Sequence, residues 1–321
     1  MPLLVRFLGT SASRPTVERG VSSVVVEREG ETMLFDCGEG TQRQMMRYGV
    51  SFALNDIFFS HFHADHFLGL PGLLRTMALQ GRSEPMHLWG PPGANRFLKQ
   101  AASLGAERPT FPLQIHELEP GAVAKRGDYS IVAVPAVHRG PTALTYGLVE
   151  DERRGRFNPE RARELGIPEG PLWGRIHRGE SVSLDDGRVI EPGALVGPTR
   201  HGRRIVITGD TRPCDATVEL ARGADLLVHE ATFAEEEAER ARETGHSTAR
   251  EAADVAARAG VRRLVLTHLS ARYTRDTTDL EREARAAFPA TIIARDGMEI
   301  DVSFVDESLG ATTPHSAATS Y

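Results

Sequence analysis

The chain has 321 residues, of which 40% are hydrophobic, and a formal net charge of −6. This length allows one large domain or two ordinary ones, and the negative charge excludes nucleic-acid binding through overall charge alone. No run of 18 apolar residues occurs, so we expect no membrane partner. The only cysteines are Cys37 and Cys214, which excludes a disulfide framework and predicts a reducing, cytoplasmic location.

Strand-like runs, short and rich in Val, Ile and Leu, recur along the chain at 4–8, 22–27, 33–35, 57–60, 87–89, 131–135, 144–149, 205–208, 226–228, 264–267 and 291–293. Helical patterns lie between them at 41–48, 67–80, 94–104, 215–222, 233–243, 247–259 and 276–288. Ser247 and Asp276 are the expected N-caps, and Gly223 and Gly260 the expected C-terminal stops. Strands first cluster and later alternate with helices, which predicts a layered α/β fold with mixed sheets.

The stretch 150–204 breaks this pattern. It is rich in Gly and Pro and shows only one short helical segment, at 159–165. A structureless insert of this length inside a compact domain is uncommon and often functional, although a passive surface excursion is the alternative. We therefore expect a single domain over 1–305, interrupted by a flexible arm at 150–204, and a disordered Ser/Thr/Ala-rich tail at 306–321.

The segment His61-Phe62-His63-Ala64-Asp65-His66 carries three imidazoles and one carboxylate between a strand-like and a helix-like run. A strand that ends in such a cluster holds its side chains at a fixed edge. Neutral imidazole and carboxylate suit Zn²⁺, with Fe and Mn as further candidates. A histidine run without a ligand is typical of polar tails rather than of a position between two apolar elements. The segment therefore predicts a metal site.

Three later residues also follow strand-like runs, namely His138, Asp210 and His268. Taken singly, each is more often a cap or a turn residue. Taken with the first cluster, they allow two ions that share Asp210. The first ion would be held by His61, His63 and His138, and the second by Asp65, His66 and His268. Two ions roughly 3.5–4 Å apart can activate a water for hydrolysis. Phosphodiester, thioester and β-lactam substrates fit this chemistry equally well.

These residues resemble the metallo-β-lactamase superfamily through His-x-His-x-Asp-His followed by a later His, Asp and His. Further stretches, spread from about residue 3 to 303, resemble its tRNA 3′-processing branch, the short-form tRNase Z (ribonuclease Z) endonucleases. They are Phe-Leu-Gly-Thr-Ser at 7–11, Phe-Asp-Cys-Gly-Glu-Gly-Thr-Gln at 35–42, Ser-His-Phe-His-Ala-Asp-His at 60–66, Gly-Pro-Leu-Trp-Gly at 170–174, Gly-Asp-Thr at 209–211, His-Glu-Ala-Thr at 229–232, His-Ser-Thr at 246–248 and Thr-His at 267–268.

The resemblance implies a four-layer αββα sandwich with the site at one edge and a protruding arm. It implies that the seven residues named above bind two Zn²⁺ ions, and that Asp65 also orients or deprotonates the attacking water. His246 would protonate the leaving oxygen or stabilise the scissile phosphate, assisted by Glu230.

The resemblance also implies a role for the 150–204 insert, which would grip the elbow of a precursor tRNA far from the cut, with Gly170, Pro171 and Trp173 in the arm. The arm carries both arginines and glutamates, so recognition of RNA shape is expected to matter more than charge. Members of the family form homodimers in which one subunit's arm can hold tRNA for the other's site.

The expected function is a zinc-dependent endoribonuclease that removes the 3′ trailer from precursor tRNA. It would leave a 3′-hydroxyl on the tRNA and a 5′-phosphate on the trailer. Two alternatives remain open. One is a small-molecule metallo-hydrolase of the same superfamily, acting on a phosphodiester, thioester or lactone. The other is a non-catalytic RNA-binding protein, which the absence of bound metal would favour.

Overall fold

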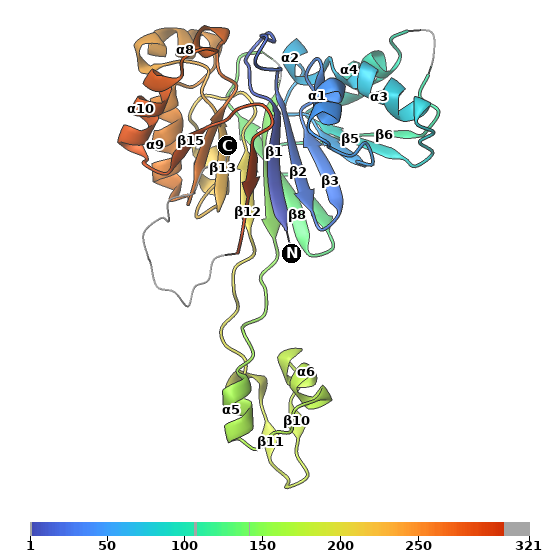
Figure 1. The fold of residues 1–321 in the computed structure, drawn as a ribbon, viewed down its shortest axis with the longest axis vertical. Coiled ribbons are helices and arrows are strands. Elements are labelled where there is room, and N and C mark those ends of the chain that lie inside the picture. Colours follow the sequence, from blue (N-terminus) through green and yellow to red (C-terminus); the bar gives the residue numbers. More distant parts are fainter. Residues whose placement is uncertain (1, 106–107, 141, 305–321) are drawn as a thin grey trace.

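The computed structural model describes residues 2–105, 108–140 and 142–304, and the expected tail at 306–321 lies outside these ranges. Two mixed sheets of seven strands face one another, and helices cover their outer surfaces, so the body has the expected αββα layers (Figure 1). Within the described part of the chain, every helix is too short or too polar to cross a bilayer.

The first sheet combines an antiparallel half with a parallel half. Its strand order is β16 (Glu299–Asp301), β1 (Leu3–Gly9), β2 (Ser23–Arg28), β3 (Glu31–Phe35), β4 (Asp56–Phe58), β5 (Met86–Gly90) and β6 (Leu113–Glu117). Its outer face is covered by α1 (Thr41–Arg47), α2 (Ala64–Phe67), α3 (Leu70–Leu79) and α4 (Ala94–Ala102).

The second sheet is parallel from β12 to β15 and antiparallel from β12 to β7. Its strand order is β15 (Thr291–Ile293), β14 (Leu264–Thr267), β13 (Leu226–Glu230), β12 (Arg204–Ile207), β9 (Ala143–Glu150), β8 (Tyr129–Ala136) and β7 (Val123–Arg126). The helical segments of this half are α7 (Asp215–Leu220), η2 (Glu235–Glu237), α8 (Ala238–Thr244), α9 (Ala249–Ala259), η3 (Ala271–Tyr273) and α10 (Thr278–Ala287).

Three apolar clusters fill the three interfaces between these layers. In β2, Val24 and Val26 point between the sheets, whereas Val25 points toward the helices. The same alternation puts Phe58 between the sheets and Ile57 under the helices. Strands buried on both faces read as continuous apolar runs, which is why they were recognisable in the sequence.

Several element boundaries differ from the sequence prediction. The helix expected at 67–80 is observed as α3, which begins at Leu70, after the short α2 has ended at Phe67. Between them Gly69 packs on the backbone of Gly38, where an added Cβ would lie 2.0 Å from the Gly38 carbonyl oxygen. The N-cap of α9 is Thr248 rather than Ser247, and it forms a capping box with Glu251. The N-cap of α10 is Thr277 rather than Asp276. The left-handed Gly260 ends α9 as predicted.

The strands β6, β7 and β16 were missed in the sequence because many of their side chains are exposed or half-exposed. All three form sheet edges, where apolar runs are not required.

The arm leaves the body after β9 and returns at β12, and it stands apart at the end of the sheets opposite α2 and α8 (Figure 1). The expectation of a structureless insert with one helix was wrong. The arm contains α5 (Pro159–Glu164), α6 (Pro171–His177), a hairpin of β10 (Val182–Ser183) and β11 (Val189–Ile190), and η1 (Pro192–Ala194). Its own small core consists of Ala162, Ile167, Ile176, Val182, Ile190 and Leu195. These apolar residues are too scattered along the chain to produce a periodic signal.

We expect the body to fold without the arm. The arm's core is separate from the three body clusters. The two chain segments that join the arm to the body, called the crossings below, touch at Gly155, where an added Cβ would lie 1.9 Å from the Gly197 carbonyl oxygen. Replacing residues 157–196 by a short Gly-Ser turn should leave a cooperative melt with a midpoint within about 5 °C of the full chain. Circular dichroism measures this, and loss of the cooperative transition would show that the arm is part of the body's core.

Candidate metal centre and active site

The structure brings all seven sequence-predicted ligands to one edge of the sandwich. His61 and His63 follow β4, and Asp65 and His66 lie in α2. The other three each follow a strand of the second sheet, with His138 after β8, Asp210 after β12 and His268 after β14. Strands β4, β12 and β14 belong to the parallel parts of their sheets, and parallel strands end at a common edge, so residues far apart in sequence meet there.

The ligand atoms form two groups, in each of which all atoms lie within 4.8 Å of one another. The first group is His61, His63, His138 and Asp210. The second group is Asp65, His66 and His268. In the first group, the Nδ1 atom of His63 lies 3.0 Å from the Nε2 atoms of both His61 and His138. In the second, His268 Nε2 lies 3.3 Å from both His66 Nε2 and Asp65 Oδ2. Nitrogen and oxygen atoms that converge in this way are arranged as ligands around common points.

The buried Asp210 lies between the two groups. Its Oδ2 atom faces His61 at 3.6 Å and His138 at 3.8 Å, and its Oδ1 atom faces His66 at 3.3 Å and His268 at 3.2 Å. Oδ1 makes no hydrogen bond within the described structure, although the side chain is only 2% exposed. A buried carboxylate oxygen without a donor fits a position beside a cation. The donor set therefore fits divalent-metal binding, with Asp210 facing both groups.

The protonation of the imidazoles also suits metal binding. Burial lowers the pKa of His61 and His63, so both are neutral near pH 7. Burial would also lower the pKa of His66, but the carboxylates of Asp210, Asp36 and Asp65 outweigh it and raise the pKa. A cation that replaces the proton on His66 would be attracted by the same carboxylates.

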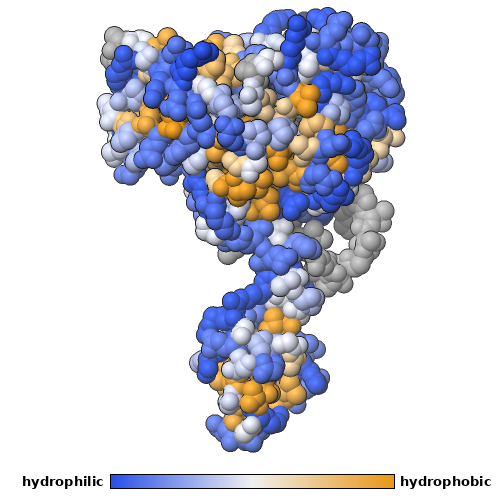
Figure 2. All heavy atoms as spheres, turned by 180° about the vertical axis from the view of Figure 1, so that it is seen from behind, coloured by the Kyte–Doolittle hydropathy of each residue, from blue (hydrophilic) through white to orange (hydrophobic). Residues whose placement is uncertain are grey.

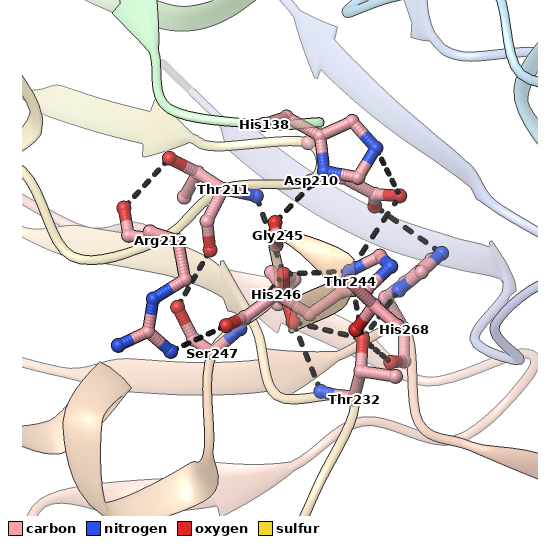
Figure 3. Close-up of polar contacts among 12 residues, drawn as sticks. His138, Asp210, Thr211, Arg212, Thr232, Thr244, Gly245, His246, Ser247 and His268 are labelled. Atoms are coloured by element: carbon pink, nitrogen blue, oxygen red, sulfur yellow. Dashed lines mark hydrogen bonds and ion pairs between the residues drawn. The ribbon is translucent and has the colours of Figure 1, made fainter. Parts of the chain in front are cut away.

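Four of the five ligand histidines are oriented by a contact at Nδ1, which leaves Nε2 facing the site. The four contacts are Ser60 Oγ to His61 at 3.0 Å, Asp36 Oδ2 to His66 at 2.8 Å, the Gly245 carbonyl to His138 at 2.8 Å, and Thr232 Oγ1 to His268 at 2.9 Å. Figure 3 shows the last two around His246. Sequence reasoning gave none of these partners a role.

Asp36 had a detectable signal, because it directly follows the strand-like run 33–35, as the ligands follow theirs. It accepts hydrogen bonds from the Ser60 backbone N–H at 2.7 Å and hydroxyl at 2.8 Å, besides its contact with His66. Its φ of 58° lies in the left-handed region, which a non-glycine residue occupies only when its surroundings hold it there.

Asp65 has a second partner on the loop that follows β1. The backbone N–H of Ser13 donates to Asp65 Oδ2 over 2.7 Å. Ser13 has a φ of 61°, in the left-handed region that non-glycine residues rarely occupy. The contact fixes the carboxylate beside His268.

His246 lies beside the ligand groups without belonging to the predicted set. Its Nδ1 atom is 2.9 Å from Glu230 Oε1 and 3.8 Å from Asp210 Oδ2. Burial opposes its protonation, but the Glu230 carboxylate outweighs that effect and raises the pKa of His246 to about 9. At neutral pH His246 therefore carries a proton that it can donate.

Glu230, at the end of β13, is 1% exposed and is held by several donors. It accepts hydrogen bonds from the backbone N–H groups of Thr211, Thr232 and Ser247 and from the Thr232 hydroxyl. That hydroxyl also contacts His268, so Glu230 links a predicted ligand to His246. Because it is buried, Glu230 could affect a substrate only through His246, with which it is hydrogen-bonded.

The structure does not bring the predicted substrate-binding residues of the arm to this site. Gly170 precedes α6, Pro171 begins it, and Trp173 lies within it, far from the ligands (Figure 1). Trp173 packs on Phe157 with ring centroids 5.2 Å apart and donates to the Ile167 carbonyl over 3.2 Å. Its ring thus stabilises the arm, while Gly170 and Pro171 are exposed.

The αββα layers with a His/Asp cluster at their edge define a metallo-β-lactamase-fold protein. Residues 187–269 match the family described as Beta-lactamase superfamily domain, and residues 3–153 match the one described as Anti-Pycsar protein Apyc1. The solved metallo-beta-lactamase fold protein YhfI from Bacillus subtilis, 18% identical, superposes with a TM-score of 0.67 over 94% of this chain and 99% of its own, which supports the fold. The fold implies divalent-metal binding.

Closer relatives identify the branch. The Ribonuclease Z of Gemmatimonas aurantiaca is 69% identical over 96% of this chain and 98% of its own length. That of Myxococcus xanthus is 54% identical over 95% and 99%. The crystal structure of human tRNase Z, short form, is 30% identical with a TM-score of 0.68, covering 94% of this chain and all of that one. The chain belongs to the ribonuclease Z family.

We expect two divalent ions per chain. Asp210→Ala should lose both ions, because the two carboxylate oxygens of Asp210 face both ligand groups. His63→Ala should weaken metal binding by the first group alone. Elemental analysis after dialysis measures the ratio, with His177→Ala in the arm as the control. An unchanged metal content in the Asp210 variant would contradict the bridging position.

Proposed function

We propose that this protein is a metal-dependent endoribonuclease that removes the 3′ trailer from precursor tRNA. The observation that carries the proposal is a pair of ligand groups that share Asp210 and lie beside His246, whose Nδ1 atom is 2.9 Å from Glu230 Oε1, in a chain 69% identical to a Ribonuclease Z. Phosphodiester hydrolysis needs both an activated water and a proton for the leaving oxygen, and the site has a group for each.

His61, His63 and His138 would hold one ion, Asp65, His66 and His268 the other, and Asp210 both. We propose Zn²⁺, because imidazole and carboxylate ligands suit it, and the same set accepts Mn²⁺ or Fe²⁺. Bound there, the ions would supply water activation and neutralise the negative charge of the phosphate.

The residues of the chain then divide the proton transfers. Asp65, held by Ser13, orients the attacking water or accepts its proton. The water oxygen bonds to phosphorus, which stays with the trailer, while the bond from phosphorus to the tRNA 3′-oxygen breaks. His246, held by Glu230, donates its proton to that 3′-oxygen. The products are a tRNA 3′-hydroxyl and a trailer 5′-phosphate.

The arm gives the substrate a second point of contact. It extends from the end of the sheets opposite the ligands, so only a long, folded substrate could use both (Figure 1). Several of its arginines are paired with glutamates, as in Arg163–Glu169 and Arg175–Glu180, which favours recognition of RNA shape over a diffuse positive field. We propose that Gly170, Pro171 and Trp173 form part of this tRNA contact.

The same geometry supports a homodimer. An arm that points away from its own metal centre can present a tRNA elbow to the centre of a second subunit, so the substrate would lie across both chains. The cytoplasmic location remains a prediction from the cysteine usage, in keeping with the free thiols of Cys37 and Cys214.

Cleavage of a precursor tRNA with defined ends, with Zn²⁺ or Mn²⁺ supplied, tests the function. We expect a single cut near the acceptor-stem end, and a large loss of this activity when residues 157–196 are replaced by a short turn. Hydrolysis of bis-p-nitrophenyl phosphate should survive that replacement, because the small ester needs only the metal centre. Absence of a cut in the full chain, with the small ester hydrolysed, would instead favour a small-molecule hydrolase.

We expect His246→Ala to lower kcat on precursor tRNA by about 100- to 10,000-fold, the usual effect of a general acid. The loss on bis-p-nitrophenyl phosphate should be much smaller, because p-nitrophenolate leaves without a proton. Equal losses on both substrates would contradict proton donation.

Glu230→Gln should move the alkaline limb of the tRNA cleavage profile to lower pH. The carboxylate raises the pKa of His246 to about 9, and the donating form is lost above that pKa. Bound cations would lower the pKa of His246 in both the unmodified protein and Glu230→Gln, so the alkaline limb of Glu230→Gln would still lie at the lower pH. A pH–kcat profile of each protein measures the shift, and coinciding limbs would show that Glu230 does not set this pKa.

A further inference from the structure

The root of the arm contains a buried charged pair. Glu150 is the last residue of β9 before the arm, and Arg203 is the last arm residue before β12. They are 7% and 2% exposed. Arg203 donates from Nη2 to Glu150 Oε1 over 2.6 Å, and from Nε and its backbone N–H to Oε2 over 2.8 and 3.0 Å. The two crossings of the arm are thus joined by one carboxylate.

A third charged residue ties this pair to the other sheet. Arg28, at the end of β2, donates from Nε to Glu150 Oε1 over 2.9 Å and from Nη2 to Asp128 over 2.7 Å. Burial would raise the pKa of Glu150, but its hydrogen bonds from Arg203 and Arg28 outweigh burial and lower it. Glu150 is therefore ionised between two guanidinium groups, one from each half of the sandwich.

The aromatic ring of Phe304 also packs against this network. The guanidinium of Arg203 lies 4.0 Å from the ring centroid of Phe304, and that of Arg153 lies 3.3 Å from it. Arg203 Nη1 also donates to the Val302 carbonyl over 3.2 Å. The segment after β16 therefore packs against both crossings of the arm.

The crossings run as a narrow two-chain stalk beyond this point. Gly202 lies so close to the Glu150 backbone that an added Cβ would be 2.4 Å from its carbonyl oxygen. Arg153 and Arg200 then form a β-bridge. Among the residues that the structure describes, these two chains alone join the body to the arm in Figure 1, so their root sets the direction in which the arm leaves the body.

We propose that Arg28, Glu150, Arg203 and Phe304 form a root clamp that fixes the direction of the arm and thereby determines how well the enzyme binds precursor tRNA. The clamp residues are positioning residues, because they lie at the opposite end of the sheets from the metal ligands. The proposal rests on the proposed function, in which the arm binds tRNA.

The physical reason lies in the geometry of a two-point contact. A substrate that must reach the arm and the metal centre together binds best when their relative placement is fixed in advance. Buried ion pairs are a poor source of stability, but they can specify one arrangement because any other leaves a charge unpaired. The clamp holds one arrangement at the place where the stalk leaves the body.

The first measurement is of arm direction without RNA. Spin labels on cysteines introduced at Asp185, in the turn between β10 and β11, and at Glu219 on α7 report the distance between arm and body, with Cys214→Ser to remove a background thiol. We expect Glu150→Gln to broaden the distance distribution. The control is Glu281→Gln, the same change in an ion pair with Arg285 on α10, outside the clamp.

The second measurement is kinetic. In Glu150→Gln, KM for precursor tRNA should rise about 10-fold with a smaller change in kcat, because pre-arranged contacts far from the chemistry are lost. The rate on bis-p-nitrophenyl phosphate and the metal content should stay within about 2-fold, since neither depends on pre-arranged contacts with the arm. Phe304→Leu, which keeps the apolar volume and removes the cation–π contacts, should give a weaker effect of the same kind and replaces Glu150→Gln if that variant does not fold.

An unchanged distance distribution in the clamp variants would overturn the proposal, and so would a broadened distribution with an unchanged KM. Failure of the proposed function is distinguishable, because the unmodified protein would then leave precursor tRNA uncut. In that case the link between the clamp and tRNA binding is overturned as well, while the distance measurement still decides whether the clamp fixes the arm.

Discussion

The buried carboxylate of Asp210 is the constraint on which the rest of the site depends. A charge in this position is costly unless cations or donors surround it, and Asp210 divides its two oxygens between two groups of imidazoles. The surrounding histidines are in turn oriented through Nδ1, with Asp36 and Ser60 on one side and Glu230 and Thr232 on the other. Two further buried carboxylates therefore fix the direction in which the ligands face.

The same arrangement explains why the site lies on a rigid edge. His268, like Asp36, has a φ in the left-handed region, and both follow strands that pack between layers. Strained backbone persists only where the surrounding structure holds it, and three apolar interfaces do so here. The His246–Glu230 pair is joined to this fixed frame through Thr232, so the predicted ligands and the proposed proton donor share one network of hydrogen bonds.

The arm obeys a different constraint. It has a small core of its own and is joined to the body by two chains, so its placement depends on the few contacts at its root. Hydrophobic residues gather on the lower part of the body and again within the arm, with a mainly polar stalk between them (Figure 2). The ligand cluster and the arm are therefore built as separate parts, and Glu150 with Arg203 lies where the arm joins the body.

The sequence alone determined the layered α/β class and the seven clustered side chains, because buried strands leave apolar runs, and the first ligand cluster, His138, Asp210 and His268 each come after one. It also marked His246 and Glu230 through family motifs. Only the tertiary structure decided what orients them, since Thr232 and His268 are 36 residues apart. Likewise, the folded arm and the contact of Arg28 with Glu150 across 122 residues depend on packing between distant segments, which leaves no local pattern to read.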